Sequence, residues 1–175
     1  MQAQIQNTNI TNMKLELTFL KHVKASLLLI MIFLVIIFII YYIGLNAKNS
    51  LYIILPMFIL LILPTLYVHL NYYNEGKGFV YELNKDEIKV INDNGVIIFH
   101  KENFKKIEIY MSGTRLAGLV IRNFPFEDYY YAKIIMNDGK EIIISCLFSK
   151  KIDKILPSLY GEIPLVKIKD FYPII

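Results

Sequence analysis

Two long apolar runs fill the first half of the chain. Residues 25–47 contain no Lys, Arg, Asp or Glu, and after Lys48 the same holds for residues 49–74. The hydrocarbon core of a bilayer is about 30 Å thick, and a helix needs about 20 apolar residues to cross it. The pattern therefore predicts two transmembrane helices, at about residues 26–45 and 51–70, joined as a hairpin.

Each run has an alternative interpretation. A cleaved signal peptide has an apolar core of only about 7 to 15 residues and ends at a small-x-small site, where this chain places Leu45. The second run contains Pro56 and Pro64, which are typical of a kinked helix but also of a transport path. A transport path needs ionisable groups, and only His69 at the end of the run qualifies. We therefore favour a retained anchor with a structural kink.

Beyond Glu75 the apolar residues recur at every second position, which is typical of half-buried strands. Tight turns are indicated at Asp93-Asn94-Gly95 and at Asn137-Asp138-Gly139. The alternation predicts seven strands. They are Gly78–Leu83, Glu87–Asn92, Val96–His100, Lys105–Met111, Leu116–Ile121, Tyr129–Met136 and Lys140–Cys146.

One short amphipathic helix follows these strands. Ser149 is a candidate N-cap, and Pro157 is expected to end or bend the helix. Its apolar stripe consists of Ile152, Ile155, Leu156 and Leu159. The predicted fold class is a membrane protein of the α + β type, in which two transmembrane helices precede an antiparallel seven-stranded barrel or sandwich with one C-terminal helix.

The predicted elements divide the chain into three segments. These are an N-terminal tail at 1–24, the hairpin at 25–74 and a β domain at 75–175. Residues 1–12 are too polar to form a core and are expected to be disordered, whereas residues 15–23 are expected to begin the first helix.

The charges beside the apolar runs predict the orientation of the hairpin. Lys14, Lys21 and Lys24 precede the first run, whereas the loop between the runs has only Lys48. The positive-inside rule then places the N-terminus in the cytosol, and two crossings return the C-terminus there. The predicted location is the cytoplasmic (inner) membrane, with the β domain on the cytosolic side.

The sequence offers no recognisable catalytic or metal-binding set. Cys146 lies in an apolar strand, which predicts a buried and unreactive thiol. Glu127 and Asp128 are adjacent, and neighbouring side chains in an extended chain point to opposite faces. The histidines are scattered, at His22, His69 and His100. We therefore expect no enzymatic activity, no metal and no cofactor.

The remaining candidates for binding are basic. They are Lys101, Lys105, Lys106, Arg115, Arg122, Lys150, Lys151 and Lys154. Lys150 and Lys151 are the most suggestive, because cations at the start of a helix are mildly unfavourable. From Glu75 onward 15 Lys and Arg face 14 Asp and Glu, a net charge of +1. An anionic surface would attract this domain only if its basic residues share one face, and no nucleic-acid partner is expected.

The order of the elements resembles bacterial membrane proteins in which a two-helix hairpin precedes a pleckstrin-homology-like (PH-like) domain. Two strings strengthen the resemblance: FPFEDYYYA at residues 124–132 and DGKEIIIS at residues 138–145. The resemblance covers about residues 20–175. It implies a PH-like barrel and a binding role, and it brings no catalytic residues.

Three functions are compatible with the sequence. The favoured one is a non-enzymatic, two-pass membrane module that binds a membrane or cytosolic protein, or a lipid headgroup, at the cytoplasmic leaflet. A partner could add a strand to an exposed sheet edge. The second is an immunity or defence role against membrane-active peptides, and the third is a small oligomeric transport subunit. Oligomerisation stays open in all three.

Overall fold

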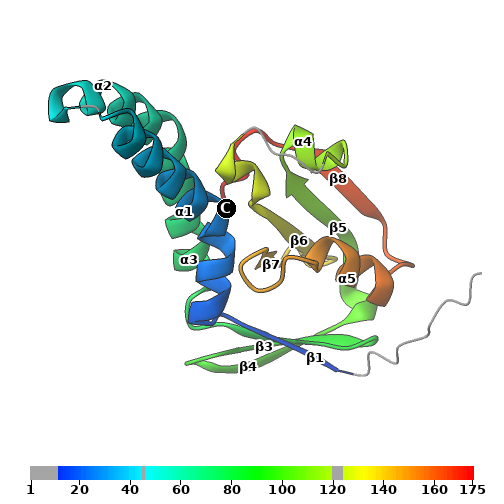
Figure 1. Ribbon diagram of the computed structural model, residues 1–175. Helices are drawn as coiled ribbons and strands as arrows, with labels where there is room; N and C mark the ends of the chain where they lie inside the picture. The colour runs from blue at the N-terminus through cyan, green and yellow to red at the C-terminus, as the bar shows by residue number, and fades with distance from the viewer. Residues whose placement is uncertain (1–11, 45, 120–123) are drawn as a thin grey trace, which may run out of the picture.

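The computed structural model describes residues 12–44, 46–119 and 124–175. A helical hairpin stands beside two four-stranded sheets, and a short helix lies between the sheets (Figure 1). The protein is therefore of the α + β type, as predicted. The prediction left open a seven-stranded barrel or sandwich; the described strands form two four-stranded sheets, so the single seven-stranded barrel is wrong.

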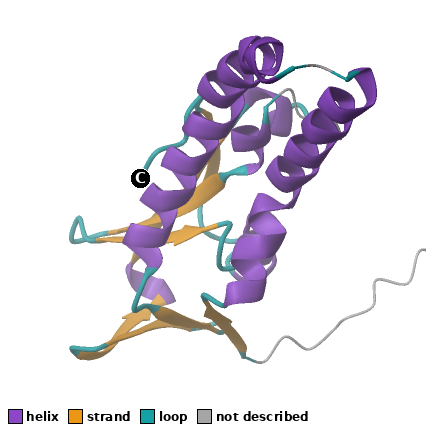
Figure 2. Cartoon of the chain, turned by 60° about the vertical axis from the view of Figure 1, so that its left-hand side comes forward, coloured by secondary structure: helices purple, strands orange, loops and turns teal. Residues whose placement is uncertain are grey.

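The hairpin has two arms that run side by side away from the strands (Figure 2). The first arm is α1 (Phe19–Ile43). The second arm consists of α2 (Ala47–Met57), the π-helical segment η1 (Phe58–Ile62) and α3 (Leu63–Gly76). Both arms are long and apolar enough to cross a membrane.

The prolines distort the second arm without interrupting it. Pro64 has no N–H to donate to a carbonyl of the preceding turn. The backbone widens there into η1, in which the Leu63 N–H donates to the carbonyl of Phe58, five residues earlier. The Thr65 hydroxyl also donates to the Leu61 carbonyl over 2.6 Å. The distortion predicted at the prolines is thus a π-helical turn.

The hairpin is inserted between two neighbouring strands of the first sheet. This antiparallel sheet has the order β1-β2-β3-β4, and β1 precedes the hairpin whereas β2 follows it. Its strands are β1 (Met13–Glu16), β2 (Val80–Leu83), β3 (Glu87–Asn92) and β4 (Gly95–His100). The β1 to β2 register pairs Met13 with Leu83 and Glu16 with Val80.

The strand β1 corrects two predictions. A tail does not extend through residues 13–16, and the first helix begins at Phe19, after the strand. Leu15 is buried in the first sheet, while its neighbour Lys14 points outward. The pattern did not predict this strand, because an alternation over only four residues is a weak strand signal when a long apolar run follows directly. The expected disorder of residues 1–12 lies almost wholly outside the described residues.

The second sheet has the order β7-β6-β5-β8. Its strands are β5 (Phe104–Met111), β6 (Tyr130–Met136), β7 (Glu141–Ser145) and β8 (Leu165–Lys169). Three of them form an antiparallel meander. The last strand, β8, returns after the C-terminal helix and pairs with β5 in parallel. The sequence pattern did not predict β8, because a parallel pairing across about 60 residues leaves no local turn signal.

The strand predicted at Leu116–Ile121 is wrong over its described part. The chain instead forms a short helix, α4 (Gly113–Leu116), whose N-cap Ser112 accepts a hydrogen bond from the Arg115 N–H. Leu116 and Leu119 are exposed, so the apolar pattern here reflects no buried face. Residues 120 and 121 lie outside the described residues.

The C-terminal helix closes the core as predicted. All four residues of its apolar stripe are buried in α5 (Ile152–Leu159). Pro157 lies within this helix and does not end it. The N-cap residue is Lys151, whose N–H donates to the Ser149 hydroxyl over 3.2 Å. Ser149 therefore stabilises the turn before the helix without being its N-cap.

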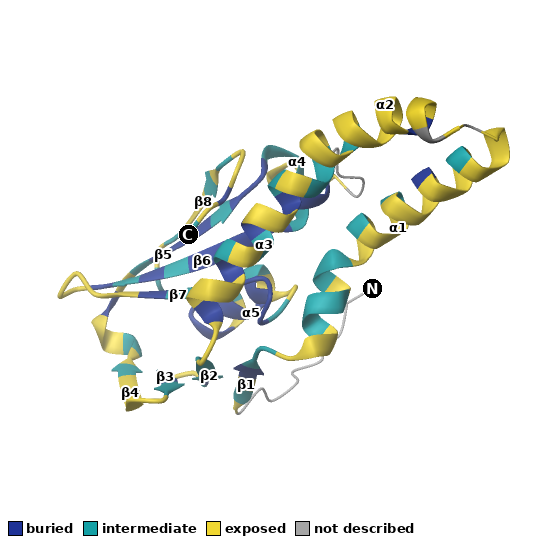
Figure 3. Ribbon diagram, turned by 90° about the vertical axis from the view of Figure 1, so that its left-hand side faces the viewer, coloured by how far each residue is buried: buried dark blue, intermediate teal, exposed yellow. Residues whose placement is uncertain are grey.

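The lower part of α3 belongs to the core of the β domain. Val68 and Tyr72 are fully buried, and the Tyr72 hydroxyl donates to the Pro173 carbonyl over 2.6 Å. Asn71 exchanges two hydrogen bonds with the backbone of Ile175. Figure 3 shows buried residues along the side of α3 that faces the sheets and exposed residues toward the hairpin tip. The hairpin is thus fixed to the domain at its base.

Replacing Tyr72 tests this attachment. We expect Tyr72→Ala to lower the free energy of unfolding by about 3–5 kcal/mol, because it removes a buried aromatic ring and leaves a carbonyl without its donor. The matched control is Tyr67→Ala on the same helix, since Tyr67 is 59% exposed. Denaturation followed by circular dichroism in detergent measures both. Equal losses in the two variants would contradict the packing of α3 on the domain.

Candidate functional site

The predicted basic residues occupy three separate places. Lys101, Lys105 and Lys106 lie at the start of β5, whereas Arg115 lies in α4 just beyond its end. A strand of eight residues separates these places by about 25 Å. Lys150 and Lys151 lie at a third place, beside the start of α1. The basic residues therefore do not share one face; Lys154 is exposed on α5, and Arg122 lies outside the described residues.

The basic residues at the start of β5 have acidic partners. The Lys101 ammonium lies 2.6 Å from a carboxylate oxygen of Glu162. The Lys106 ammonium lies 2.7 Å from Glu108, whose pKa is lowered first by that hydrogen bond and next by one from Tyr110. Two of these three lysines are thus partly neutralised within the protein.

Arg115 serves the structure of the domain. Its guanidinium lies 3.2 Å from Asp153 and 3.7 Å from the centre of the Tyr130 ring. The Tyr130 hydroxyl donates to the same carboxylate over 3.0 Å, and burial raises the pKa of this tyrosine. These contacts connect α4 to α5 and β6. Because its side chain is only 16% exposed, Arg115 offers little surface to a ligand.

Lys150 and Lys151 form one side of a pocket of about 410 Å³, here called the lysine pocket. The pocket lies between β1, the start of α1 and the segment that connects β7 to α5. Its lining residues are Met13, Lys14, Leu15, Lys21, Lys24, Cys146, Leu147, Phe148, Ser149, Lys150 and Lys151. Five lysines and no acidic residue are in this set.

A long-range hydrogen bond holds the two sides of the lysine pocket together. The Lys150 ammonium donates to the backbone carbonyl of Lys24 over 2.7 Å, across 126 positions in the sequence. On the other side, the Lys21 ammonium donates to the backbone carbonyl of Glu16 over 2.8 Å. From the sequence, Lys14, Lys21 and Lys24 were predicted only to orient the hairpin, since nothing local brings them near Lys150.

The floor of the lysine pocket is apolar. Cys146, Leu147 and Phe148 are buried there. Burial raises the pKa of the Cys146 thiol from 9.0 to about 11. The prediction of a buried thiol is thus confirmed. A thiol with such a pKa is a poor nucleophile at neutral pH.

Two of the three histidines meet at the junction between the hairpin and the domain. His22 Nδ1 on α1 lies 3.2 Å from His69 Nε2 on α3, and His69 Nδ1 lies 2.8 Å from the Tyr129 hydroxyl. The two arms of the hairpin are antiparallel, so His22 and His69 lie side by side although they are 47 positions apart in the sequence. The expectation that the histidines are scattered is therefore wrong for this pair. His100 lies apart, 3.7 Å from Glu87. Among the described residues no three His, Cys, Asp or Glu side chains could hold a metal ion.

The adjacent carboxylates Glu127 and Asp128 lie in a short 3-10 helix, η3 (Pro125–Asp128). Glu127 is buried, and its carboxylate accepts a hydrogen bond from the Phe124 N–H over 3.1 Å. This contact closes the first turn of η3. Glu127 therefore has a structural role in the turn that precedes β6.

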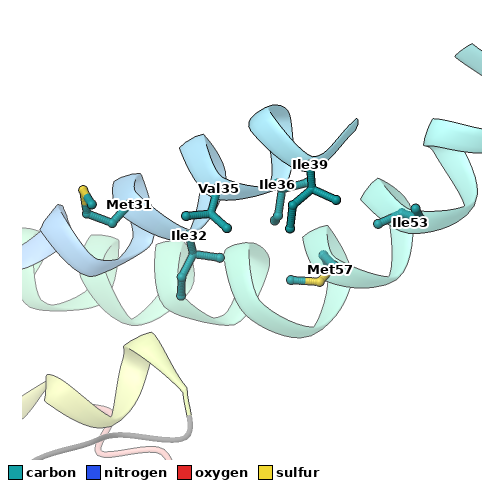
Figure 4. Close-up of a pocket in the computed structure, with 7 residues that line it drawn as sticks. All are labelled: Met31, Ile32, Val35, Ile36, Ile39, Ile53 and Met57. Atoms are coloured by element: carbon teal, nitrogen blue, oxygen red, sulfur yellow. The ribbon is translucent and has the colours of Figure 1, made fainter. Parts of the chain in front are cut away.

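A second hollow lies between the arms of the hairpin (Figure 4). Its volume is about 320 Å³, and every lining residue is apolar. The residues are Met31, Ile32, Val35, Ile36, Ile39, Ile53 and Met57. Such a lining offers no polar group to orient a ligand or to pass an ion, and it suits contact with lipid tails.

Comparison with known proteins identifies the family. The chain matches the family model described as a PH domain over residues 10–153, and it therefore belongs to that family. The match begins before β1 and continues through the hairpin to the start of α5, so it includes both strands that flank the insertion. No curated protein matches the chain.

The reactivity of Cys146 tests the geometry of the pocket floor. We expect iodoacetamide to label the folded protein at pH 8 at least about 100-fold more slowly than an exposed cysteine, because two pKa units reduce the thiolate fraction by that factor. The control is Asp138→Cys in a Cys146→Ala background, which places an exposed thiol in the β6 to β7 turn. Mass spectrometry measures both rates. Equal labelling would show that the floor of the lysine pocket is open.

Proposed function

We propose that this protein is a non-enzymatic, membrane-anchored binding module. The hairpin crosses the cytoplasmic membrane twice, and the PH-like domain binds a ligand that is presented at the cytoplasmic leaflet. The observation that carries the proposal is the insertion of the hairpin between the paired strands β1 and β2. An anchor that leaves and re-enters the same sheet holds the domain at a fixed distance from the bilayer.

The exposure of the hairpin supports a membrane location. Most large apolar residues of α1 from Leu27 onward are exposed, which is costly in water and favourable in lipid. Tyr41, Tyr42 and Tyr52 are exposed at the tip, where an aromatic belt is typical. Lys21 and Lys24 lie at the opposite end of α1. The hairpin thus carries the features expected at both faces of a bilayer.

The domain supports a binding role. It belongs to the PH family, its described thiol is buried, and the Glu127 carboxylate stabilises a turn. Two surfaces of the described domain differ in their chemistry from the rest: the lysine pocket is cationic, and the edge strand β4 is apolar and exposed. Both lie on the domain that the hairpin fixes near the leaflet.

The topology can be tested with single cysteines in a Cys146→Ala background. We expect a membrane-impermeant maleimide to label Lys48→Cys in intact cells and Asp138→Cys only after lysis, because the hairpin tip faces outward and the domain faces the cytosol. Mass shifts on gels measure the labelling. Extraction of the protein by alkaline carbonate, or labelling of both sites in intact cells, would overturn the proposed anchoring.

A protein partner that adds a strand is a second candidate, and β4 is the observation that favours it. Within the described chain β4 is the edge of its sheet, and Val96, Ile97 and Ile98 are 58%, 51% and 47% exposed. Edge strands are usually protected by charges, and the segment from Gly95 to Phe99 has none. An extended segment of a partner could pair with this free edge.

A photo-reactive amino acid at position 98 tests strand addition. We expect Ile98, when so replaced, to form a discrete protein adduct in irradiated membranes. Position 82 is the control. Glu82 and Ile98 both pair with Lys89, so their side chains face the same side of the first sheet. Glu82 lies on the inner strand β2, however, whereas Ile98 lies on the edge strand β4. Adducts that are absent, or equal at both positions, would remove the edge as a docking site.

A further inference from the structure

The free edge of β4 differs from the other sheet edges of the described chain, because its centre carries no charge. Edge strands are usually protected from pairing by charged side chains. The charged residues on the other edge strands are Lys14 and Glu16 in β1, Glu141 in β7, and Lys167 and Lys169 in β8. In β4 the residues from Gly95 to Phe99 are uncharged. This edge therefore lacks the protection that the other edges have.

The hydrogen bonds between β4 and β3 determine which backbone groups of β4 stay free. The Lys101 N–H, directly after β4, donates to the Asp86 carbonyl over 2.7 Å. Along an antiparallel pair, successive residues point their N–H and C=O groups alternately toward the paired strand and away from it. Val96, Ile98 and His100 therefore point these groups away from β3. They form a ladder of donors and acceptors with which another extended chain can pair.

A second copy of the same strand matches this ladder. When two β4 strands pair antiparallel about a two-fold axis at Ile98, this residue faces Ile98 of the second copy, and Val96 faces the second copy's His100. On the side of the sheet that faces the core, Ile97 faces the second copy's Phe99. Aromatic and β-branched side chains that lie opposite each other stabilise paired strands. No two like charges meet in this register.

The same pairing covers apolar surface beside β4. A hollow of about 260 Å³ lies between the first sheet and β7, and its lining includes Ile97 and Phe99 from β4 and Ile142 from β7. Ile97 lines this hollow and is 51% exposed. The register above sets the second copy's Phe99 directly beside Ile97. Apolar surface is thus removed from water on both copies.

The fold allows this pairing between two copies that share one membrane. The hairpin lies on one side of the first sheet, and β4 is at the opposite end of that sheet from β1 (Figure 1 and Figure 3). The two-fold axis that relates an antiparallel pair of strands is perpendicular to the sheet. The hairpins of both copies therefore leave the joined sheet on the same side. Anchoring in one bilayer also holds both β4 edges at the same distance from the membrane.

We propose that the unprotected edge of β4 binds a second copy of this chain. Two copies of the first sheet, each four-stranded, join into one continuous sheet across a two-fold axis at Ile98. This inference rests on the proposed membrane anchoring and names the partner that adds a strand. In the resulting dimer the free ladder of β4 is hydrogen-bonded, and the two hairpins are held as a pair in the bilayer.

Charges placed at the two-fold axis test the proposal, with two differently tagged copies of the full chain expressed together. Capture of one tag from a detergent extract, followed by quantification of the other tag, measures their association. We expect Ile98→Lys in both copies, or Ile98→Glu in both, to lower the co-capture at least about fivefold, because like charges directly opposite each other destabilise paired strands. A copy with Ile98→Lys and a copy with Ile98→Glu should associate like the wild type, since opposite charges then meet.

The matched control is Val166 on the edge strand β8 of the second sheet. Val166 is 48% exposed and Ile98 is 47% exposed, so a charge at either position leaves the core of one copy intact. Val166→Lys and Val166→Glu should leave the co-capture unchanged. Thermal melting followed by circular dichroism checks that all four single variants are folded.

Three outcomes would overturn the proposal. One is that wild-type copies do not capture each other, and another is an equal loss of co-capture at positions 98 and 166. The third is a mixed pair of Ile98→Lys and Ile98→Glu that associates no better than either variant with itself.

Two further measurements keep this proposal separable from the proposed function. A photo-adduct at position 98 with the mass of two chains supports self-pairing, whereas an adduct with a different protein contradicts it and retains strand addition. A protein that resists carbonate extraction but shows no self-association keeps its proposed anchor and loses only this partner.

Discussion

The pairing of β1 with β2 is the constraint on which the rest of the structure depends. These strands lie side by side although the whole hairpin separates them in sequence. The first arm must therefore begin, and the second arm must end, at the same end of two neighbouring strands, where Glu16 pairs with Val80. That closure brings α3 against the core and sets α1 beside the β7 to α5 segment. The junction of His22 with His69 and the lysine pocket both follow from this closure.

The distribution of charge separates basic residues that have carboxylate partners from those that line the lysine pocket. Lys101, Lys106 and Arg115 each have a carboxylate within 3.2 Å, so their positive charge is largely balanced inside the domain. Around the lysine pocket the balance fails, because the residues that supply its lysines come from three segments and bring only Glu16 with them. The net charge of +1 counted from Glu75 onward leaves out Lys14, Lys21 and Lys24, which the fold brings to the same pocket as Lys150 and Lys151.

The sequence pattern was reliable where a signal is local and long. The two apolar runs, the turn at Asn137-Asp138-Gly139 and the stripe from Ile152 to Leu159 each arise from the period of one element, and the structure contains all of them. The pattern failed for β1, which is short, and for β8, whose parallel partner is remote. It also failed at Leu116, where apolar residues are exposed. Local periodicity carries no information on which strands become neighbours.

The sequence by itself determined the two apolar arms of the hairpin, the hairpin turns between strands and the C-terminal amphipathic helix, because each of these depends on residues that are adjacent in the chain. Only the tertiary structure decided that the hairpin is inserted within a sheet and that Lys24 meets Lys150. Those contacts form only when a long loop closes. The entropic cost of that closure is offset by packing among residues that are distant in the sequence. The sequence singled out Lys150 and Lys151, but only such contacts bring Lys14, Lys21 and Lys24 to the same pocket.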